Sequence, residues 1–314
     1  MVKFLLRIFL LMQIGALSAQ TRVVFTPQWT PQSQFAGYYV ALEKGFYKSA
    51  GLDVEIVHPS ASYPVVNRIK DGDSDIVSMQ LLHAMAEVEN GLELVNIMQT
   101  VQRSGLQIIS RDCNIRTFDD LRGKRVGIWK AAYGELAKMP DYDMELGIEW
   151  IPFIQSINLF ISGAIDATVA MSYNEALKIK AAGFEDVSVI SFQGTDYDFP
   201  DDGIYVKKEF YEKNRDVADA FVEASRRGWE WARENVDEAV AIVLGYARKE
   251  NVATNHVMQK WMLENVLELQ CPVGCSSPTF RLEQSDFERL LSAAIKNGIL
   301  KKEVSYEEMK GGSR

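Results

Sequence analysis

Residues 22–26 read RVVFT, residues 52–57 read LDVEIV and residues 74–78 read SDIVS, and helical segments at 35–49 and 64–71 separate them. Apolar and polar side chains alternate along residues 52–57, which is typical of a strand with one buried face. Strands that alternate with helices at this spacing form parallel βαβ units. This stretch therefore predicts an α/β lobe near the amino-terminal end of the chain.

A second series of strands and helices begins at Gly105. We expect strands at 105–110, 123–129, 165–171 and 187–190, and a short helix at 117–122. Apolar runs of this length, bounded by glycines and charged turns, are typical of buried strands. The sequence therefore predicts a second α/β lobe at residues 105–203.

The remainder of the chain, from residue 204, has helical spacing almost throughout. The expected helices cover residues 214–235, 236–249, 255–269 and 283–297. Helices alone cannot form a third α/β lobe, so we expect them to pack on lobe one. Lobe one then comprises residues 20–104 and 204–314, and the chain crosses between lobes twice. Aromatic residues at helical spacing are typical of a core, and Trp229, Trp231 and Trp261 are interpreted in that way.

The first twenty residues, MVKFLLRIFLLMQIGALSAQ, have the pattern of a secretory signal peptide. Lys3 and Arg7 supply positive charge, an apolar run follows, and small residues precede Gln20. The run is shorter than the roughly 20 apolar residues that span a bilayer. We therefore expect export to the periplasm, with residues 1–19 removed by cleavage near Ala19.

Composition excludes some classes of protein. The chain has 314 residues, 25% of them charged and 47% hydrophobic, and a formal net charge of -9. Such a chain can bury a normal core. Its acidity argues against nucleic-acid binding, which relies on clustered lysine and arginine.

Three cysteines are present, Cys113, Cys271 and Cys275. In an oxidising compartment Cys271 and Cys275 could form a disulfide across a turn, or remain two free thiols, and the sequence does not decide between these. Zinc normally takes about four ligands, and no further cysteine or histidine group accompanies this pair. No metal site is expected.

Candidate ligand contacts follow the expected strand ends, because ligands of open α/β sheets bind beyond the carboxyl ends of strands. These segments supply aromatic rings, amides and one carboxylate, while Lys130 is their only cation. Rings can stack a flat heterocycle, and an amide or carboxylate can bind its edge. The predicted binding residues are Trp29, Gln34, Tyr38, Gln80, Trp129, Tyr133, Tyr173 and Glu175.

Several segments carry a resemblance to a known family. They are residues 29–31 (WTP), 36–41 (AGYYVA), 44–47 (KGFY), 51–54 (GLDV), 121–127 (LRGKRVG), 163–167 (GAIDA) and 202–206 (DGIYV). In their order and spacing they resemble the periplasmic proteins of ABC importers that bind thiamine pyrimidine precursors, and the related sulfonate-, nitrate- and taurine-binding proteins.

The resemblance implies a two-lobed periplasmic-binding-protein-like fold of type II, with parallel-rich sheets and the helical carboxyl-terminal region packed on lobe one. It implies a monomer that closes around a pyrimidine-like ligand and delivers it to an ABC permease. A sulfonate or another small organic solute is the alternative ligand. A sensor module for a membrane partner is a further alternative.

The same superfamily includes the eukaryotic-type pyrimidine synthase of thiamine biosynthesis. That enzyme carries a lysine for pyridoxal phosphate, and a histidine four residues later. Here His83 falls in register, but Met79 stands at the lysine position, and a Schiff base needs an amine. We therefore expect no catalysis and no cofactor. Asp201 and Asp202 are interpreted as a solvated turn, since two adjacent carboxylates make an incomplete metal shell.

Overall fold

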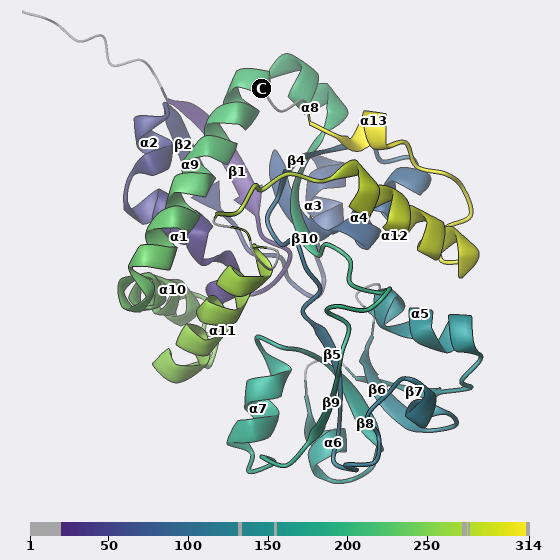
Figure 1. The fold of residues 1–314 in the computed structure, drawn as a ribbon. Coiled ribbons are helices and arrows are strands. Elements are labelled where there is room, and N and C mark those ends of the chain that lie inside the picture. Colours follow the sequence, from purple (N-terminus) through teal and green to yellow (C-terminus); the bar gives the residue numbers. More distant parts are fainter. Residues whose placement is uncertain (1–19, 131–133, 154–155, 272–274, 276, 312–314) are drawn as a thin grey trace, which may run out of the picture.

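The protein was analysed as a computed structural model, which describes residues 20–130, 134–153, 156–271, 275 and 277–311. The expected signal peptide and the candidate contact Tyr133 lie outside these residues. Two α/β lobes are joined by extended crossovers (Figure 1). The predicted mixed α/β, two-lobed fold is confirmed.

Lobe one contains a five-stranded sheet with the order β2-β1-β3-β10-β4. β1 is parallel to β2 and β3, whereas β10 is antiparallel to β3 and β4. The strands are β1 (Thr21–Thr26), β2 (Leu52–Ile56), β3 (Ile76–Gln80), β4 (Leu94–Gln99) and β10 (Asp202–Lys207).

Helices cover both faces of this sheet. Side chains alternate across it, so that Ile204 and Val206 of β10 join one apolar cluster while Tyr205 joins the other. The first face packs on α1 (Ala36–Glu43), α2 (Phe46–Ser49), α9 (Arg215–Glu234) and α10 (Val236–Lys249). The second packs on α3 (Val65–Asp71), α4 (Leu81–Glu89), α12 (Gln284–Lys296) and α13 (Tyr306–Met309).

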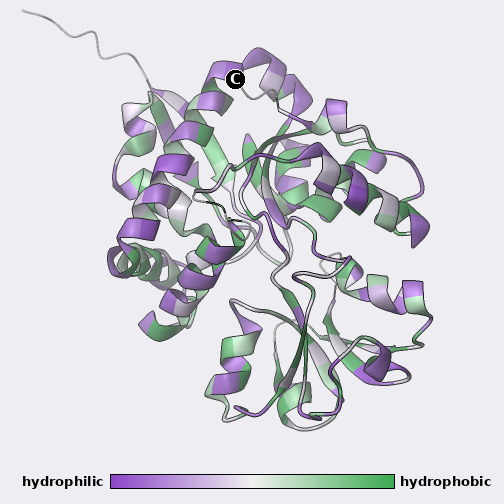
Figure 2. Ribbon diagram, viewed as in Figure 1, coloured by the Kyte–Doolittle hydropathy of each residue, from purple (hydrophilic) through white to green (hydrophobic). Residues whose placement is uncertain are grey.

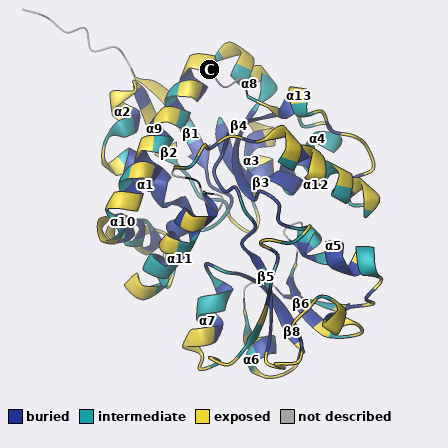
Figure 3. Ribbon diagram, in the orientation of Figure 1, coloured by how far each residue is buried: buried dark blue, intermediate teal, exposed yellow. Residues whose placement is uncertain are grey.

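Two further helices from the carboxyl-terminal region complete lobe one. They are α8 (Lys208–Lys213), which follows β10, and α11 (His256–Leu269), which packs against α10. The expected helical region therefore folds back on lobe one. Figure 2 shows hydrophilic and hydrophobic residues interspersed along the helices, and Figure 3 shows buried residues concentrated in the sheets.

Lobe two contains a second sheet with the order β7-β6-β8-β5-β9. Its strands are β5 (Leu106–Ser110), β6 (Arg125–Trp129), β7 (Glu149–Phe153), β8 (Ala167–Met171) and β9 (Ser188–Ser191). Its helices are α5 (Glu135–Met144), α6 (Asn158–Ile161) and α7 (Glu175–Ala181). In this lobe β5 is antiparallel to both of its neighbours.

The two crossovers are tied to each other between the lobes. Asp198 accepts from the Arg103 side chain at 2.7 Å and from the Ser104 N–H at 2.9 Å. The N–H groups of Thr100 and Val101 donate to the Asp202 carbonyl at 2.9 Å. β10 follows the second crossover and is antiparallel to β3 and β4. Its first residue, Asp202, therefore lies opposite Gln80, the last residue of β3.

Some elements differ from expectation. The return to lobe one already includes Asp202, because this residue pairs with Gln80 of β3. The helix expected at 35–49 is broken at Gly45, whose φ of 71° is left-handed. β4, β7 and β10 were not predicted. β7 contains Pro152, which lacks an N–H donor and is tolerated because this strand lies at the sheet edge.

Helices α1 and α9 approach closely at two glycines. A Cβ on Gly228 would lie against the Gly37 carbonyl oxygen and the Ala41 side chain, and a Cβ on Gly37 would overlap the Trp229 ring. Trp229 is buried and makes an edge-on contact with Tyr38, with centroids 5.5 Å apart. Packing of the helical region on lobe one therefore depends on these glycines.

Gly228→Ala is expected to destabilise the protein by about 2 kcal/mol, because overpacking a close helix contact forces backbone movement. Urea unfolding measures this. Gly245→Ala, in α10 where nothing lies within 4 Å of a new Cβ, is the matched control. It should stabilise by about 0.5–1 kcal/mol through helix propensity. Equal effects of the two substitutions would contradict the close approach.

No helix within the described ranges is long and apolar enough to cross a membrane.

Candidate functional site

The candidate site lies where strand ends of both lobes meet. At the lobe-one sheet, Asp202 is opposite Gln80, the last residue of β3, and Gly203 is opposite Gln99, the last residue of β4. At the lobe-two sheet, residues 172–175 follow directly after β8. The start of β10 thus lies beside the carboxyl ends of its neighbours, where open α/β sheets bind ligands.

Asp202 is held by side-chain amides from the segment after β1. Gln28 Nε2 and Gln34 Nε2 both donate to its carboxylate, the latter at 2.5 Å. Gln34 Oε1 accepts in turn from Gln32 Nε2 at 2.5 Å. The Gln28 N–H donates to Ser78 Oγ at 2.8 Å, which fixes this segment on β3. The predicted contact Gln34 therefore positions a carboxylate that the sequence analysis did not select.

Asp201 and Asp202 are buried, with exposed fractions of 7% and 5%, and the solvated-turn interpretation was wrong. Burial raises the pKa of Asp202 to about 6, an effect that Gln34 and Gln28 partly oppose. Burial and the neighbouring Asp202 raise the pKa of Asp201 well above its usual range, and the Gln80 amide opposes this. The register of β10 buries the pair.

Glu175 is the first residue of α7 and is 5% exposed. Its carboxylate accepts from the Met171 N–H at 2.9 Å and from Asn174 Nδ2 at 3.0 Å. Burial raises its pKa, and donors that include the Trp129 indole oppose the shift. The lobe-two side therefore offers a preorganised acceptor beside an indole.

Tyr173 connects the two halves of the site. It is 4% exposed, and burial raises the pKa of its hydroxyl, with further contributions from the charges of Asp202, Asp201 and Glu175. Within the described part of the chain, its hydroxyl makes no hydrogen bond. Tyr173 of lobe two is therefore near enough to the acidic pair of lobe one for these charges to raise the pKa of its hydroxyl.

Trp29 and Tyr38 lie on the lobe-one side. Trp29 is half-buried, and its carbonyl is 2.6 Å from His58 Nδ1, while His58 Nε2 is 2.9 Å from the Tyr39 hydroxyl. Burial lowers the pKa of His58, so a neutral imidazole donates to Trp29 and accepts from Tyr39.

Tyr38 is a core residue in this structure, with its hydroxyl 2.7 Å from Thr100 Oγ1. Burial raises the pKa of Tyr38, and the charge of Asp202 adds to this rise. The structure thus brings together Gln34, Gln80, Trp129, Tyr173 and Glu175, and it adds the missed pair Asp201 and Asp202.

The position that would hold the lysine of the synthase carries no amine in this chain. Met79, at the expected lysine position, is fully buried in the second apolar cluster of lobe one. His83 lies on α4, one turn before Glu87 and 3.8 Å from its carboxylate. Among the described residues no group of histidine, cysteine and acidic side chains could hold a metal ion.

A separate hollow of about 770 Å³ lies on lobe one, away from this site. We call it the lobe-one groove. Its walls include Tyr211, Val222, Arg226, Phe280, Arg281, Tyr306 and Lys310.

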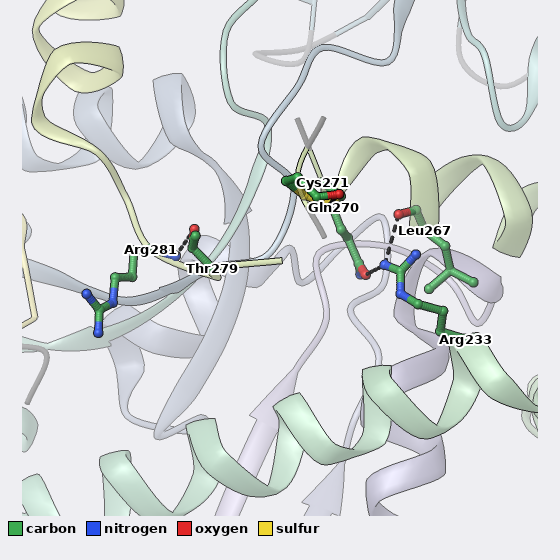
Figure 4. The surroundings of a disulfide bond; sticks show 7 residues. Arg233, Leu267, Gln270, Cys271, Thr279 and Arg281 are labelled. Atoms are coloured by element: carbon green, nitrogen blue, oxygen red, sulfur yellow. Dashed lines mark hydrogen bonds between the residues drawn. A yellow bond between two sulfur atoms is a disulfide. The ribbon is translucent and has the colours of Figure 1, made fainter. Parts of the chain in front are cut away.

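A disulfide joins Cys271 and Cys275, whose Cα atoms are 5.8 Å apart (Figure 4). It follows the end of α11. There the Arg233 side chain of α9 donates to the Leu267 carbonyl and to Gln270 Oε1. The Leu269 carbonyl accepts from the Gln102 N–H of the first crossover at 2.9 Å. The disulfide is therefore close to the crossovers, and Cys113 is exposed with a free thiol.

Reduction of this disulfide is expected to cost about 2 kcal/mol of stability, the chain-entropy value for a loop of about five residues. The melting temperature with and without dithiothreitol measures it. Cys271→Ser should melt at the temperature of the reduced wild type and lose its response to dithiothreitol. Cys113→Ser should keep the wild-type response. A wild-type melting temperature that dithiothreitol leaves unchanged would contradict a bonded pair.

Comparison with known proteins places the chain in a family. The family described as NMT1/THI5 like matches residues 32–239. The chain belongs to the NMT1/THI5-like family. Residues 32–239 include Gln34, Tyr173, Glu175 and the acidic pair, whereas Gln28 and Trp29 precede the matched segment.

Two curated relatives of this NMT1/THI5-like chain are named as binding proteins. The riboflavin-binding protein RibY of Chloroflexus aurantiacus is 23% identical, over 87% of this chain and 83% of that protein. The formylaminopyrimidine-binding protein of Halalkalibacterium halodurans is 26% identical, over 76% of this chain and 75% of its own length. A pyrimidine phosphate synthase of Saccharomyces cerevisiae, THI5, is 23% identical but covers only 34% of this chain and 32% of the synthase.

The solved structures share the fold. The periplasmic aliphatic sulphonate-binding protein SsuA of Escherichia coli superposes with a TM-score of 0.66 at 14% identity, over 92% of this chain and 96% of that one. The NMT1/THI5-like chain therefore has the periplasmic-binding-protein-like fold.

Proposed function

We propose that this protein is exported to the periplasm, captures a small flat heterocycle of the aminopyrimidine type between its lobes, and delivers it to an ABC permease. The observation that carries the proposal is the meeting of Tyr173 and Glu175 of lobe two with Gln34 and Asp202 of lobe one. An aminopyrimidine presents a flat ring and an amino edge, which match an aromatic face and carboxylate acceptors.

The crossovers supply the means of closure. They join the lobes as short extended segments, and ligand contacts made with both lobes at once stabilise the closed arrangement. Trp261 of α11 already donates to the Ser172 carbonyl of lobe two at 3.1 Å, so the lobes have interacting surfaces beside the site.

A sulfonate ligand is less compatible with these residues. Ionised Asp202 would repel an anion, and the exposed Lys130 is the only cation in the predicted binding segments. The synthase alternative lacks its amine, because Met79 is buried in the core. A role as a sensor module for a membrane partner uses the same binding step and differs only in the partner.

Native mass spectrometry of protein purified from the periplasm tests the proposal. We expect a product that starts near Gln20 and carries a co-purifying small heterocycle. Calorimetry then compares 4-amino-2-methylpyrimidine, riboflavin and taurine. Saturable one-to-one binding of the aminopyrimidine, with taurine inactive, supports the proposal. Tight binding of taurine or riboflavin without the aminopyrimidine would overturn the ligand class.

A further inference from the structure

We propose that Asp202, with Asp201 beside it, makes the interlobe site selective for a cationic ligand, so that an aminopyrimidine binds with its ring protonated. This inference rests on the proposed function and specifies the form of ligand that the same site accepts.

The acidic pair has no cation to balance its charge within the described residues. Asp201 and Asp202 are more than nine-tenths buried, and within the described residues neither forms a salt bridge. Gln28 and Gln34 donate to Asp202, but neutral amides do not cancel a buried charge. A buried carboxylate without a cation is costly, and it is relieved by a proton or by a cationic partner.

Other titratable groups are influenced by the charge of Asp202. Tyr38 of α1, Tyr173 after β8 and Tyr205 of β10 each have a pKa that is raised by burial and, further, by the charge of Asp202, so their hydroxyls stay neutral. Glu175 of α7 adds a further carboxylate beside Tyr173. No facing group among the described residues supplies the missing positive charge.

The Tyr173 hydroxyl gives an independent sign of a ligand. The Tyr173 side chain is 4% exposed, and its hydroxyl makes no hydrogen bond within the described residues. Hydroxyls in such positions are normally satisfied, so this one is available to a ligand or a water. A protonated aminopyrimidine offers a ring N–H and an amino group as charge-assisted donors to a carboxylate.

Calorimetry of 4-amino-2-methylpyrimidine at pH 8, in two buffers of different ionisation enthalpy, tests the inference. Free ligand and free Asp202 are then both deprotonated, so binding should take up about one proton per ligand. The ultraviolet spectrum of the bound ligand should match its protonated form, which places the proton on the ring and not on a carboxyl group.

Asp202→Asn should lower the affinity on the order of 10- to 100-fold, as expected for loss of a charged acceptor, and should abolish proton uptake. Asp237→Asn removes an exposed carboxylate that pairs with Lys260, and it should change neither quantity. Binding without proton uptake, or with the spectrum of the neutral ring, would overturn the inference and leave the proposed function standing. If the wild type binds no aminopyrimidine, the proposed function itself fails, and this inference fails with it.

Discussion

Replacement of Glu175 by alanine is expected to lower the affinity for an aminopyrimidine about 100-fold, near 3 kcal/mol, the upper value for a hydrogen bond to a charged group. The carboxylate is buried at the start of α7 and is oriented by the Met171 N–H and Asn174. Little reorganisation is therefore needed when a ligand donates to it. Titration calorimetry of the variant and the wild type measures the difference.

The controls separate binding from folding. Glu175→Gln keeps an oxygen that can accept from the Met171 N–H, so lobe two should stay folded while affinity still falls, because the charge is lost. Glu185→Ala removes an exposed carboxylate from the same lobe and should bind as the wild type does. If Glu175→Ala and Glu175→Gln both bind with unchanged affinity, Glu175 does not contact the ligand.

Asp202→Asn is expected to stabilise the ligand-free protein at pH 8 by about 3 kcal/mol. This is the free energy that corresponds to a rise of the carboxyl pKa from 3.8 to about 6. The folded protein binds the proton on the Asp202 carboxyl group more tightly than the unfolded chain does. The contribution of this proton to wild-type stability is complete below pH 3.8 and is lost as the pH rises through about 6. The difference between variant and wild type should therefore be small near pH 4 and should grow to its full value above pH 6.

Urea unfolding at a series of pH values measures this difference curve. In Asp202→Asn the Gln28 amide can turn its oxygen toward the new side-chain NH₂, so the local hydrogen bonds persist. Asp237→Asn, at an exposed carboxylate whose pKa is lowered by Lys260, should give a nearly flat curve. A destabilised Asp202→Asn at pH 8 would mean that Asp202 has a compensating cation. A gain in stability with a loss of binding is typical of a functional site.

Much of the fold could be predicted because its signals are local. The alternation in residues 52–57 and the spacing of the carboxyl-terminal helices follow directly from which side chains are buried. β4 and β7 were missed because their sequences lack such a pattern, and β7 contains a proline. The position of β10 between β3 and β4 is a property of topology, and no local pattern shows it.

Only those residues of the candidate site that follow a strand with a local sequence signal could be predicted. Tyr173 and Glu175 follow a recognisable strand, whereas Asp201 and Asp202 precede a glycine and have the composition of a turn. Only the register of β10 with Gln80 and Gln99 buries them. The apolar run Ile204–Val206 directly after Gly203 was the available signal, since it indicates a buried strand that begins at the acidic pair.

Hydrogen–deuterium exchange with and without 4-amino-2-methylpyrimidine tests most directly the central claim that a ligand is held between the lobes. We predict slower exchange in peptides from both lobes, covering residues 28–38, 171–176 and 199–203. Exchange should be unchanged at the lobe-one groove, in peptides covering residues 279–283 and 306–310. Protection confined to one lobe, or to the lobe-one groove, would contradict the account.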